Sequence, residues 1–501
     1  MCARDTDHED QPKKRGFFQF RDKLVAEGRL PELERPAKPA GSVGPLHRPD
    51  RPNVLWIMAD QLRGDTFGFM GHPVCRTPAL DRLAAQGMVF TRSYCSQPVC
   101  EPSRATMLTG HNSFQNGVLQ NGYRLRAGEV TLPEILARSG YTTANIGKTH
   151  CGRPGREVFQ HEQPVRDVYG VTFPSDVAFD PELFPGTTYL GGEPVTNPNE
   201  VISGAYPGPV ESTKSYNIAT QARVWLEQQN GANPFLLRVS FDDPHPPVVP
   251  PEPYASMYSP GDVPDEVIGT QRESMAGKPA TVRDWQAYKY MDRVTEGEHR
   301  VHAARYWGLV SHLDAQIGRV LEYLEELGLA DNTIVIMNSD HGQMTGEHGL
   351  IHKGPYLYDG ITRIPTIVSW PGHVEPGRST DALVSGVDLT PTLLDLLNEP
   401  VPGDLHGRSW RPLLEGPPGS WREAVFMQWE DYVFGVRTDR YKLTWYDSDE
   451  DGELYDLRTD PLELHNLYHE SDYGAVRADL ADRLAKWRSR YARRDDLPCP
   501  G

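Results

Sequence analysis

Apolar segments that alternate with helical patterns constrain the fold of this chain more than any other feature. We read buried strands at 53–60, 142–148, 235–241, 333–340 and 365–370. Helical patterns lie between or after them, at 78–86, 131–138, 216–229, 299–328 and 389–397. Strands that alternate with helices along the chain predict an α/β fold, with a large, mostly parallel sheet flanked by helices.

The pattern changes near residue 420, where four short segments with strand character follow one another, at 424–430, 432–438, 441–446 and 452–457. They predict a smaller antiparallel sheet, against which a helix at 474–492 would pack. We therefore expect an N-terminal arm (1–50), a large α/β domain (51–410) and a C-terminal subdomain (411–501).

Charge and cysteine content narrow the class of protein. Among 501 residues, 69 Asp and Glu outnumber 51 Lys and Arg, and the net charge of −18 argues against a nucleic-acid or polybasic membrane binder. No apolar run approaches the ~20 residues of a membrane helix, and the charged N-terminus lacks a signal-peptide pattern, so a cytoplasmic location is expected. The cysteines lack the spacing of a zinc ribbon or a disulfide framework; they are residues 2, 75, 95, 100, 151 and 499.

Chemically active side chains follow the ends of the predicted strands. The set comprises two carboxylates, one carboxamide, three histidines, two lysines and one arginine, together with a cysteine. The candidates are Asp60, Gln61, Cys100, Arg104, Lys148, His150, His245, Asp340, His341 and Lys353. Ligands of open α/β sheets gather outside the carboxyl ends of the strands, so we expect these side chains to meet at one rim.

The residue types at this rim indicate a reaction class. Carboxylate, amide and imidazole ligands suit a hard divalent cation, and lysine with arginine suits a tetrahedral oxyanion. Histidines such as His150 and His245 can supply a general base and a general acid. The set therefore predicts metal-assisted hydrolysis of a sulfate, phosphate or phosphonate ester.

The segment Cys100-Glu101-Pro102-Ser103-Arg104, followed by a short helix that ends in Leu-Thr-Gly, resembles the type I sulfatase signature. Other blocks resemble the same family in the same order, among them MADQLRGD, SFDDPHPP and SDHGQMTGEHGLIHKG, and the resemblance covers roughly residues 51–470. It implies an alkaline-phosphatase-like fold and a sulfuric ester hydrolase. In this family the signature cysteine is oxidised to formylglycine.

The resemblance also implies a role for each candidate. Asp60, Gln61, Asp340, His341 and an oxygen of modified Cys100 would bind the metal. Arg104 and Lys148 would hold the nucleophile, and His150 would be the base that breaks the covalent intermediate. His245 and Lys353 would bind substrate at the leaving-group oxygen, and Asn121 is a further candidate substrate contact.

Cofactors and partners follow from the same resemblance. We expect one divalent metal, with Ca²⁺ the first choice and Mg²⁺ or Mn²⁺ the alternatives, and formylglycine at residue 100 made by a maturation enzyme. The substrate would be a small-molecule or carbohydrate sulfate ester, with a sugar, aryl or choline alcohol half left open. The N-terminal arm could reach a neighbouring subunit, so a homo-oligomer is a further hypothesis.

Two alternatives stay open. The pairing of Gln61 with His341 also occurs in branches that resemble choline sulfatases and phosphonate monoester hydrolases, and Asn121 sits where the latter branch contacts substrate, so a phosphonate monoester or phosphodiester hydrolase is one alternative. Lys148 with His150 favours a sulfatase. The second alternative is a non-catalytic anion- or metal-binding pseudoenzyme, which would follow if Cys100 is never oxidised. Acidic and imidazole side chains nearby could bind the alcohol half or only cap the structure; they are Asp242, Asp243 and His352.

Overall fold

A computed structural model of the chain describes residues 51–152, 158–165, 187–190, 192, 201–229, 231–265, 275–447 and 451–491. The predicted N-terminal arm lies outside these ranges, as does part of the segment at 152–215. Across the described ranges, no helix has both the length and the apolar character that a membrane span requires.

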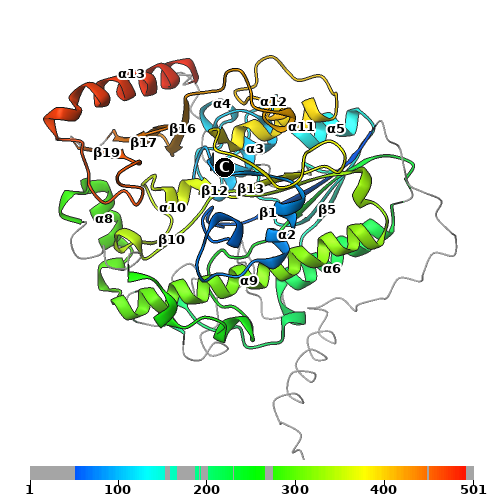
Figure 1. Ribbon diagram of the computed structural model, residues 1–501, viewed down its shortest axis with the longest axis horizontal. Coiled ribbons are helices and arrows are strands. Elements are labelled where there is room, and N and C mark those ends of the chain that lie inside the picture. Colours follow the sequence, from blue (N-terminus) through cyan, green and yellow to red (C-terminus); the bar gives the residue numbers. More distant parts are fainter. Residues whose placement is uncertain are drawn as a thin grey trace, which may run out of the picture.

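An eight-stranded sheet forms the centre of the molecule, in the order β14-β2-β13-β9-β1-β8-β4-β5 (Figure 1). Its strands are β1 (Asn53–Ala59), β2 (Met88–Phe90), β4 (Thr142–Gly147), β5 (His161–Gln163), β8 (Phe235–Ser240), β9 (Thr333–Ser339), β13 (Thr366–Ser369) and β14 (Arg378–Thr380). The pairings of β1 with β8 and β9, and of β4 with β5 and β8, are parallel, whereas β13 runs antiparallel to β9 and β2. The sheet is therefore mostly parallel, which confirms the predicted fold class.

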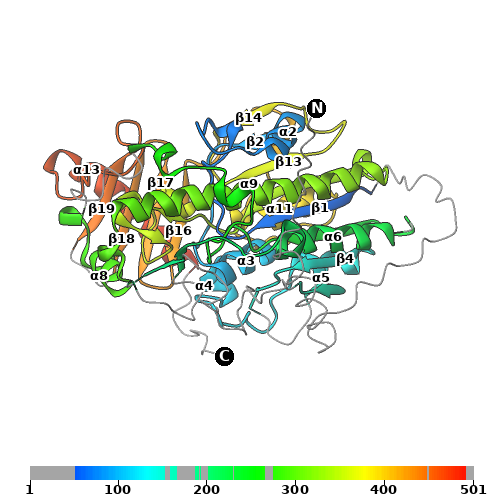
Figure 2. The ribbon, with the colours of Figure 1, turned by 90° about the horizontal axis from the view of Figure 1, so that it is seen from below.

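Helices cover both faces of this sheet (Figures 1 and 2). One face carries α2 (Pro78–Gln86), α6 (Lys214–Glu227) and α9 (Glu296–Glu326); the other carries α3 (Cys100–Thr109), α5 (Leu132–Arg138) and α11 (Leu389–Leu396). Side chains alternate along β1, so Leu55 and Ile57 enter the first core while Trp56 and Met58 enter the second. Burial of both faces explains why this strand is apolar throughout.

Shorter elements connect the longer ones. Short helices are α4 (Ser113–Asn116), α8 (Ala280–Tyr288), α10 (Asp359–Thr362) and α12 (Arg411–Glu415). Short strands pair as β3 (Ser93–Tyr94) with β12 (Arg363–Ile364) and β15 (Val384–Ser385), β10 (Met344–Thr345) with β11 (Ile351–His352), and β6 (Thr188–Tyr189) with β7 (Val201–Ser203).

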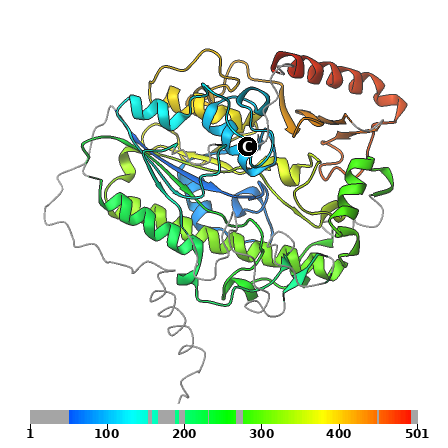
Figure 3. The same ribbon diagram turned by 180° about the vertical axis from the view of Figure 1, so that it is seen from behind.

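A second sheet of four antiparallel strands lies at one end of the molecule (Figure 3). Its strands follow chain order as β16 (Ala424–Trp429), β17 (Val433–Thr438), β18 (Tyr441–Tyr446) and β19 (Gly452–Asp456). Helix α13 (Gly474–Tyr491) packs on one face, where its Leu480 and Leu484 join a core with Phe434 and Val436. The predicted antiparallel sheet and its helix are confirmed, while the proposed division of the chain at residue 411 stays a prediction.

Local signals in the sequence also match the structure. Helix α2 has the predicted bounds, 78–86, and α5 begins at Leu132, one residue after the predicted start, with Thr131 as its N-cap. Thr131 and Glu134 form a capping box, in which each side chain bonds the other residue's backbone N–H. These helix starts follow from local chemistry and needed no knowledge of the whole fold.

Candidate active site

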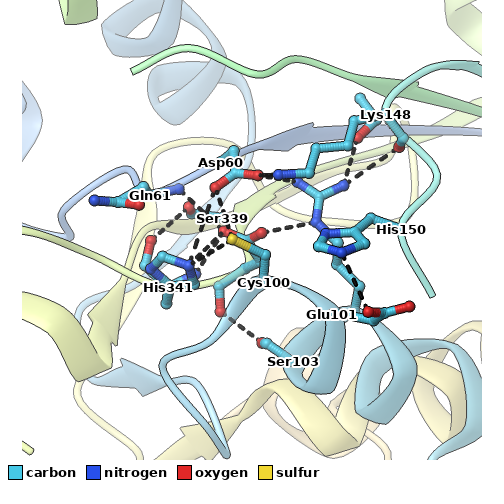
Figure 4. A network of polar contacts seen from close by, with 12 residues as sticks. Asp60, Gln61, Cys100, Glu101, Ser103, Lys148, His150, Ser339 and His341 are labelled. Carbon is cyan, nitrogen blue, oxygen red and sulfur yellow. Dashed lines mark hydrogen bonds and ion pairs between the residues drawn. The ribbon is translucent and has the colours of Figure 1, made fainter. Parts of the chain in front are cut away.

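Four strands of the central sheet end at the same edge, and each delivers a predicted site residue there. Asp60 follows β1, Lys148 follows β4, Asp340 follows β9, and His245 lies five residues after β8. Because these strands run in parallel, their carboxyl ends meet at one edge. Figure 4 shows Asp60 and Lys148 side by side at this edge, with Cys100 and His341 next to them.

Cys100 is the first residue of α3, and it lies at the centre of this edge. Its Sγ is 3.5 Å from Asp60 Oδ1, 3.3 Å from His341 Nε2 and 2.9 Å from Lys353 Nζ. The residue is fully buried, and Arg104 follows one helical turn later with no exposed surface. The helix N-terminus points its partial positive charge at the same spot, which favours an anion on residue 100.

Four groups at this edge could hold a metal ion. One ligand atom each from Asp60, Cys100, Asp340 and His341 lies within 4.8 Å of the other three, and all four residues are buried. Nδ1 of His341 is 2.8 Å from the carbonyl oxygen of Gly342, so it carries the proton and leaves Nε2 as the ligand atom. The residues present therefore fit a divalent cation.

Gln61 is the fifth predicted metal ligand. Its backbone is in the left-handed region, with φ 66°, and its N–H donates to Asp340 Oδ1 at 3.0 Å. The side-chain amide donates to Gln343 Oε1 at 2.6 Å, which turns the amide oxygen toward Lys353 Nζ, 3.0 Å away. The carboxamide oxygen thus lies on the side of the cluster where Lys353 enters.

Arg104 and Lys148 are the two cations that bind the carboxylates. Arg104 donates from Nη2 to Asp60 Oδ2 at 3.1 Å and from Nε to Asp340 Oδ2 at 2.7 Å, and the Lys148 ammonium binds Asp60 Oδ2. Burial and the Cys100 sulfur raise the pKa of Asp60, but the positive charges of Lys148, His245 and Arg104 outweigh them and lower it to about 2. Asp60 is therefore ionised throughout the physiological range.

Positive charges near Cys100 also act on its thiol. Burial raises the pKa of the Cys100 thiol, yet Lys148, Lys353, His341 and a hydrogen bond with His150 bring it well below its usual value. A site that stabilises an anion at this position so strongly would stabilise an oxygen anion there as well.

His150 lies on the side of Cys100 away from His341 (Figure 4). Its Nε2 is 3.2 Å from Glu101 Oε2. Burial lowers the pKa of His150, but hydrogen bonds with Cys100 and Glu101 raise it above the ordinary value overall. Asn121 Oδ1 accepts the backbone N–H of Glu101 at 3.1 Å, so this predicted substrate contact, which is itself exposed, lies beside the buried first turn of α3.

His245 and the acids before it lie in the loop after β8. The imidazole is 5% exposed, and its Nδ1 is held 2.7 Å from the carbonyl oxygen of Pro246. Asp243 Oδ2 accepts from Ser215 Oγ at 2.6 Å, and Asp242 pairs with Lys214 at 2.8 Å. Both acids bind residues of α6, which supports the capping interpretation for them.

Sequence reasoning missed several residues that support the predicted ones. Glu101 orients His150, Gln343 orients Gln61, and Ser103 Oγ donates to the Asp340 carbonyl at 2.6 Å. Ser240 Oγ accepts from Arg104 Nη1 at 2.8 Å. Glu101 and Ser103 lie inside the cysteine signature and Gln343 directly follows Asp340-His341-Gly342, so proximity in sequence was the only available signal.

Known proteins resemble this chain along most of its length. The Sulfatase family model matches residues 52–399, and the model of the N-sulphoglucosamine sulphohydrolase C-terminal region matches residues 346–490. An arylsulfatase of Clostridium perfringens is 30% identical, with 84% of this chain and 91% of the relative covered. An N-acetylglucosamine-6-O-sulfatase of Bacteroides thetaiotaomicron is 26% identical, with 89% and 88% covered. The solved structure of a phosphonate monoester hydrolase of Agrobacterium radiobacter superposes with a TM-score of 0.75 at 28% identity, covering 88% of this chain and 96% of that one.

Proposed function

Because this chain belongs to the sulfatase family and hydrolyses sulfate esters, we propose that its nucleophile is formylglycine, made from Cys100 by a separate oxidising maturation enzyme. One observation carries the proposal. The Cys100 sulfur lies within 3.5 Å of both Asp60 and His341, in the cluster of groups that could bind a metal, with Lys353 at 2.9 Å. An oxygen at this position would be shared between a cation and the reacting ester.

Asp60, Gln61, Asp340 and His341 would hold the cation, together with an oxygen on residue 100. Two carboxylates, one amide oxygen and one imidazole favour Ca²⁺, with Mg²⁺ or Mn²⁺ as alternatives. When bound, the cation supplies positive charge that lowers the pKa of the attacking hydroxyl and stabilises the transferring sulfuryl group.

The first step would transfer the sulfuryl group to residue 100. The hydrated aldehyde has two hydroxyl groups; one oxygen bonds to sulfur as the bond from sulfur to the alcohol oxygen breaks, and its proton passes to Asp340. Lys148 and Lys353 stabilise negative charge on the other sulfuryl oxygens. His245 donates a proton to the departing alcohol oxygen.

The second step would release sulfate without attack of water on sulfur. His150 takes the proton of the remaining hydroxyl, the aldehyde carbonyl re-forms, and the bond between carbon and the sulfate oxygen breaks. Glu101, 3.2 Å from His150 Nε2, stabilises the imidazolium that results. Water then adds to the aldehyde and restores the two hydroxyl groups.

Mass spectrometry of the peptide that spans residue 100, from protein made in its native host, tests this proposal. We expect an aldehyde in place of an alkylatable thiol, together with sulfate release from an aryl sulfate. An intact thiol in that protein would instead favour the pseudoenzyme. A Cys100→Ser variant should accept one sulfuryl group and then stall, because a serine ester lacks the second hydroxyl; full turnover by this variant would reject the aldehyde.

A phosphonate monoester hydrolase is the second candidate, favoured by the 28% identical structure with a TM-score of 0.75 and by the position of Asn121 beside Glu101. Lys148 and His150 support the sulfatase, since both face residue 100. Rates on matched aryl sulfates and aryl phosphonate monoesters separate the two, and we expect the higher kcat/KM on the sulfates. The reverse order would make the phosphonate reaction the main activity.

A further inference from the structure

Arg238 is a buried arginine on β8, in the middle of the central sheet. None of its surface is exposed, and its guanidinium carbon lies 5.3 Å from the ring centre of Trp56 and 4.8 Å from that of Phe159. No carboxylate among the described residues lies within 4.0 Å of its nitrogens. Burial and the positive charge of Arg104 lower the pKa of Arg238 to about 9. A cation buried in this way without an ion pair destabilises the folded state.

The hydrogen bonds of Arg238 go to the turn that leaves β4. Its Nε donates to Asn145 Oδ1 at 2.7 Å, and its Nη2 donates to the carbonyl oxygens of Lys148 at 3.4 Å and Thr149 at 3.2 Å. Asn145 lies opposite Arg238 in the sheet register, and its Nδ2 donates to the carbonyl oxygen of Gly147 at 3.2 Å. The two side chains together bind three successive carbonyl oxygens of one turn.

This turn has an unusual backbone. Gly147 and His150 have φ values of 95° and 40°, both in the left-handed region, and a Cβ at Gly147 would lie 2.1 Å from the carbonyl oxygen of Ser240. A non-glycine residue such as His150 adopts this region at a cost, so its surroundings must hold it there.

We propose that Arg238, together with Asn145, is a positioning residue that fixes the 147–150 turn and so keeps His150 against residue 100 and Glu101. The inference rests on the proposed function, in which His150 starts the release of sulfate. Lys148 has further anchors, because its ammonium binds Asp60 and its carbonyl oxygen also accepts from Arg104 Nη1 at 3.3 Å. Loss of Arg238 therefore releases the backbone just before His150, whose side chain stays paired with Glu101, while Lys148 keeps partners on both its ammonium and its carbonyl oxygen.

An Arg238→Met variant tests the inference, because methionine fills much of the space without charge or hydrogen bonds. We expect kcat for an activated aryl sulfate to fall about 100-fold, since a small displacement of a reacting group costs that much. The value of kcat/KM should change less, and sulfated enzyme should accumulate in the intact-mass spectrum, because sulfate release is the step that slows. The melting temperature Tm should change little, since the removal of an unpaired buried charge offsets the loss of three hydrogen bonds.

Matched variants separate positioning from general stability. Leu237→Ala, one residue earlier on β8 and in the core on the opposite face, should lower Tm and leave kcat unchanged. Arg238→Lys keeps a cation that can bind one carbonyl, so its kcat should lie between those of wild type and Arg238→Met. Asn145→Ala should lower kcat and accumulate sulfated enzyme like Arg238→Met, and it decides the matter if Arg238→Met does not fold.

Two results would overturn the inference. One is an Arg238→Met or Asn145→Ala enzyme with wild-type kcat; the other is a lower Tm with no sulfated enzyme, as a purely structural role predicts. Wild-type protein in the same assay, with the aldehyde at residue 100 verified, tests the proposed function separately. Failure of wild type to release sulfate would reject that function, whereas a normal wild type beside an unaffected variant would reject only the role of Arg238.

Discussion

The reacting residues form a local excess of positive charge inside an acidic protein. Arg104 and Lys148 bind the carboxylates of Asp60 and Asp340, and Lys353 contacts Gln61 and Cys100 beside them. Three cations therefore meet two carboxylates before any metal is counted. The whole chain carries −18. A low dielectric strengthens these local charges relative to the distant surface ones, so an anionic ester can enter a protein of the same sign.

The role proposed for His245 leads to a prediction about leaving groups. The Pro246 carbonyl holds its Nδ1 at 2.7 Å and fixes the ring orientation. In His245→Ala, kcat for an alkyl sulfate should fall about 10²- to 10⁴-fold, because its alcohol needs a proton as it leaves. An activated nitrophenyl sulfate should lose far less, since nitrophenolate departs unprotonated. Sulfate release from both esters measures this, and equal losses would remove His245 from the acid role.

At the scale of single elements, helix starts contribute stability apart from catalysis. In the capping box of α5, the Thr131 hydroxyl bonds the N3 backbone and donates to Glu134 Oε2 at 2.9 Å, and α5 carries no predicted site residue. Thr131→Ala should lower the free energy of unfolding by about 1 kcal/mol. Denaturant unfolding and kcat are to be measured together, and kcat should not change. Thr131→Ser keeps the cap and is the control; equal stability of the two variants would contradict the prediction.

Elements were predictable where their signal is local, and contacts between distant elements were not. The apolar run at 53–60 and the helical period at 78–86 reflect burial along one segment, so β1 and α2 could be located closely. The direction of β13 against β9 depends on chain connections, which no pattern within 366–369 reveals. The site residues could be predicted from the family blocks. The hydrogen bonds from Arg238 to the 147–149 turn could not, because they depend on the pairing of β4 with β8.

At the scale of the whole molecule, a buried ion cluster joins the second sheet to the catalytic part. Lys442 of β18 is 1% exposed, and its ammonium lies 2.8 Å from Asp359 Oδ1 and 2.6 Å from Glu463 Oε1. Asp359 begins α10, six residues after Lys353. The cluster therefore fastens the second sheet to the segment that brings Lys353 to the reaction centre.

Removal of the lysine from this cluster should be costly. Lys442→Met leaves two buried carboxylates without the ammonium that binds both, so the free energy of unfolding should fall by about 3–5 kcal/mol. Lys486→Met is the control, because Lys486 pairs with Asp482 on the surface of α13 with 75% of its side chain exposed, and its loss should cost less than about 0.5 kcal/mol. Denaturant unfolding measures the free energy of unfolding of both variants. Similar losses in Lys442→Met and Lys486→Met would mean that the buried cluster does not stabilise the second sheet.

The two carboxylates of the cluster share one lysine, and their protonation should make stability depend on pH. Burial raises the pKa of Asp359, but Lys442 and Arg437 lower it overall. For Glu463 burial outweighs the attraction of Lys442, and its pKa rises to about 7 from 4.5. Between pH 4.5 and about pH 7, Glu463 of the folded chain therefore holds a proton that the unfolded chain has released. This contribution to stability is complete below pH 4.5 and is lost as the pH rises through 7.

Glu463→Gln tests this linkage, because glutamine stays neutral at every pH. Between pH 5 and pH 8 the wild type should lose about 1–3 kcal/mol more unfolding free energy than Glu463→Gln. Denaturant unfolding at both pH values, with Glu375→Gln as an exposed control whose side chain is 75% accessible, measures the difference. Parallel pH profiles for wild type and Glu463→Gln would show that Glu463 is already ionised at pH 5, and that Lys442 balances two negative charges.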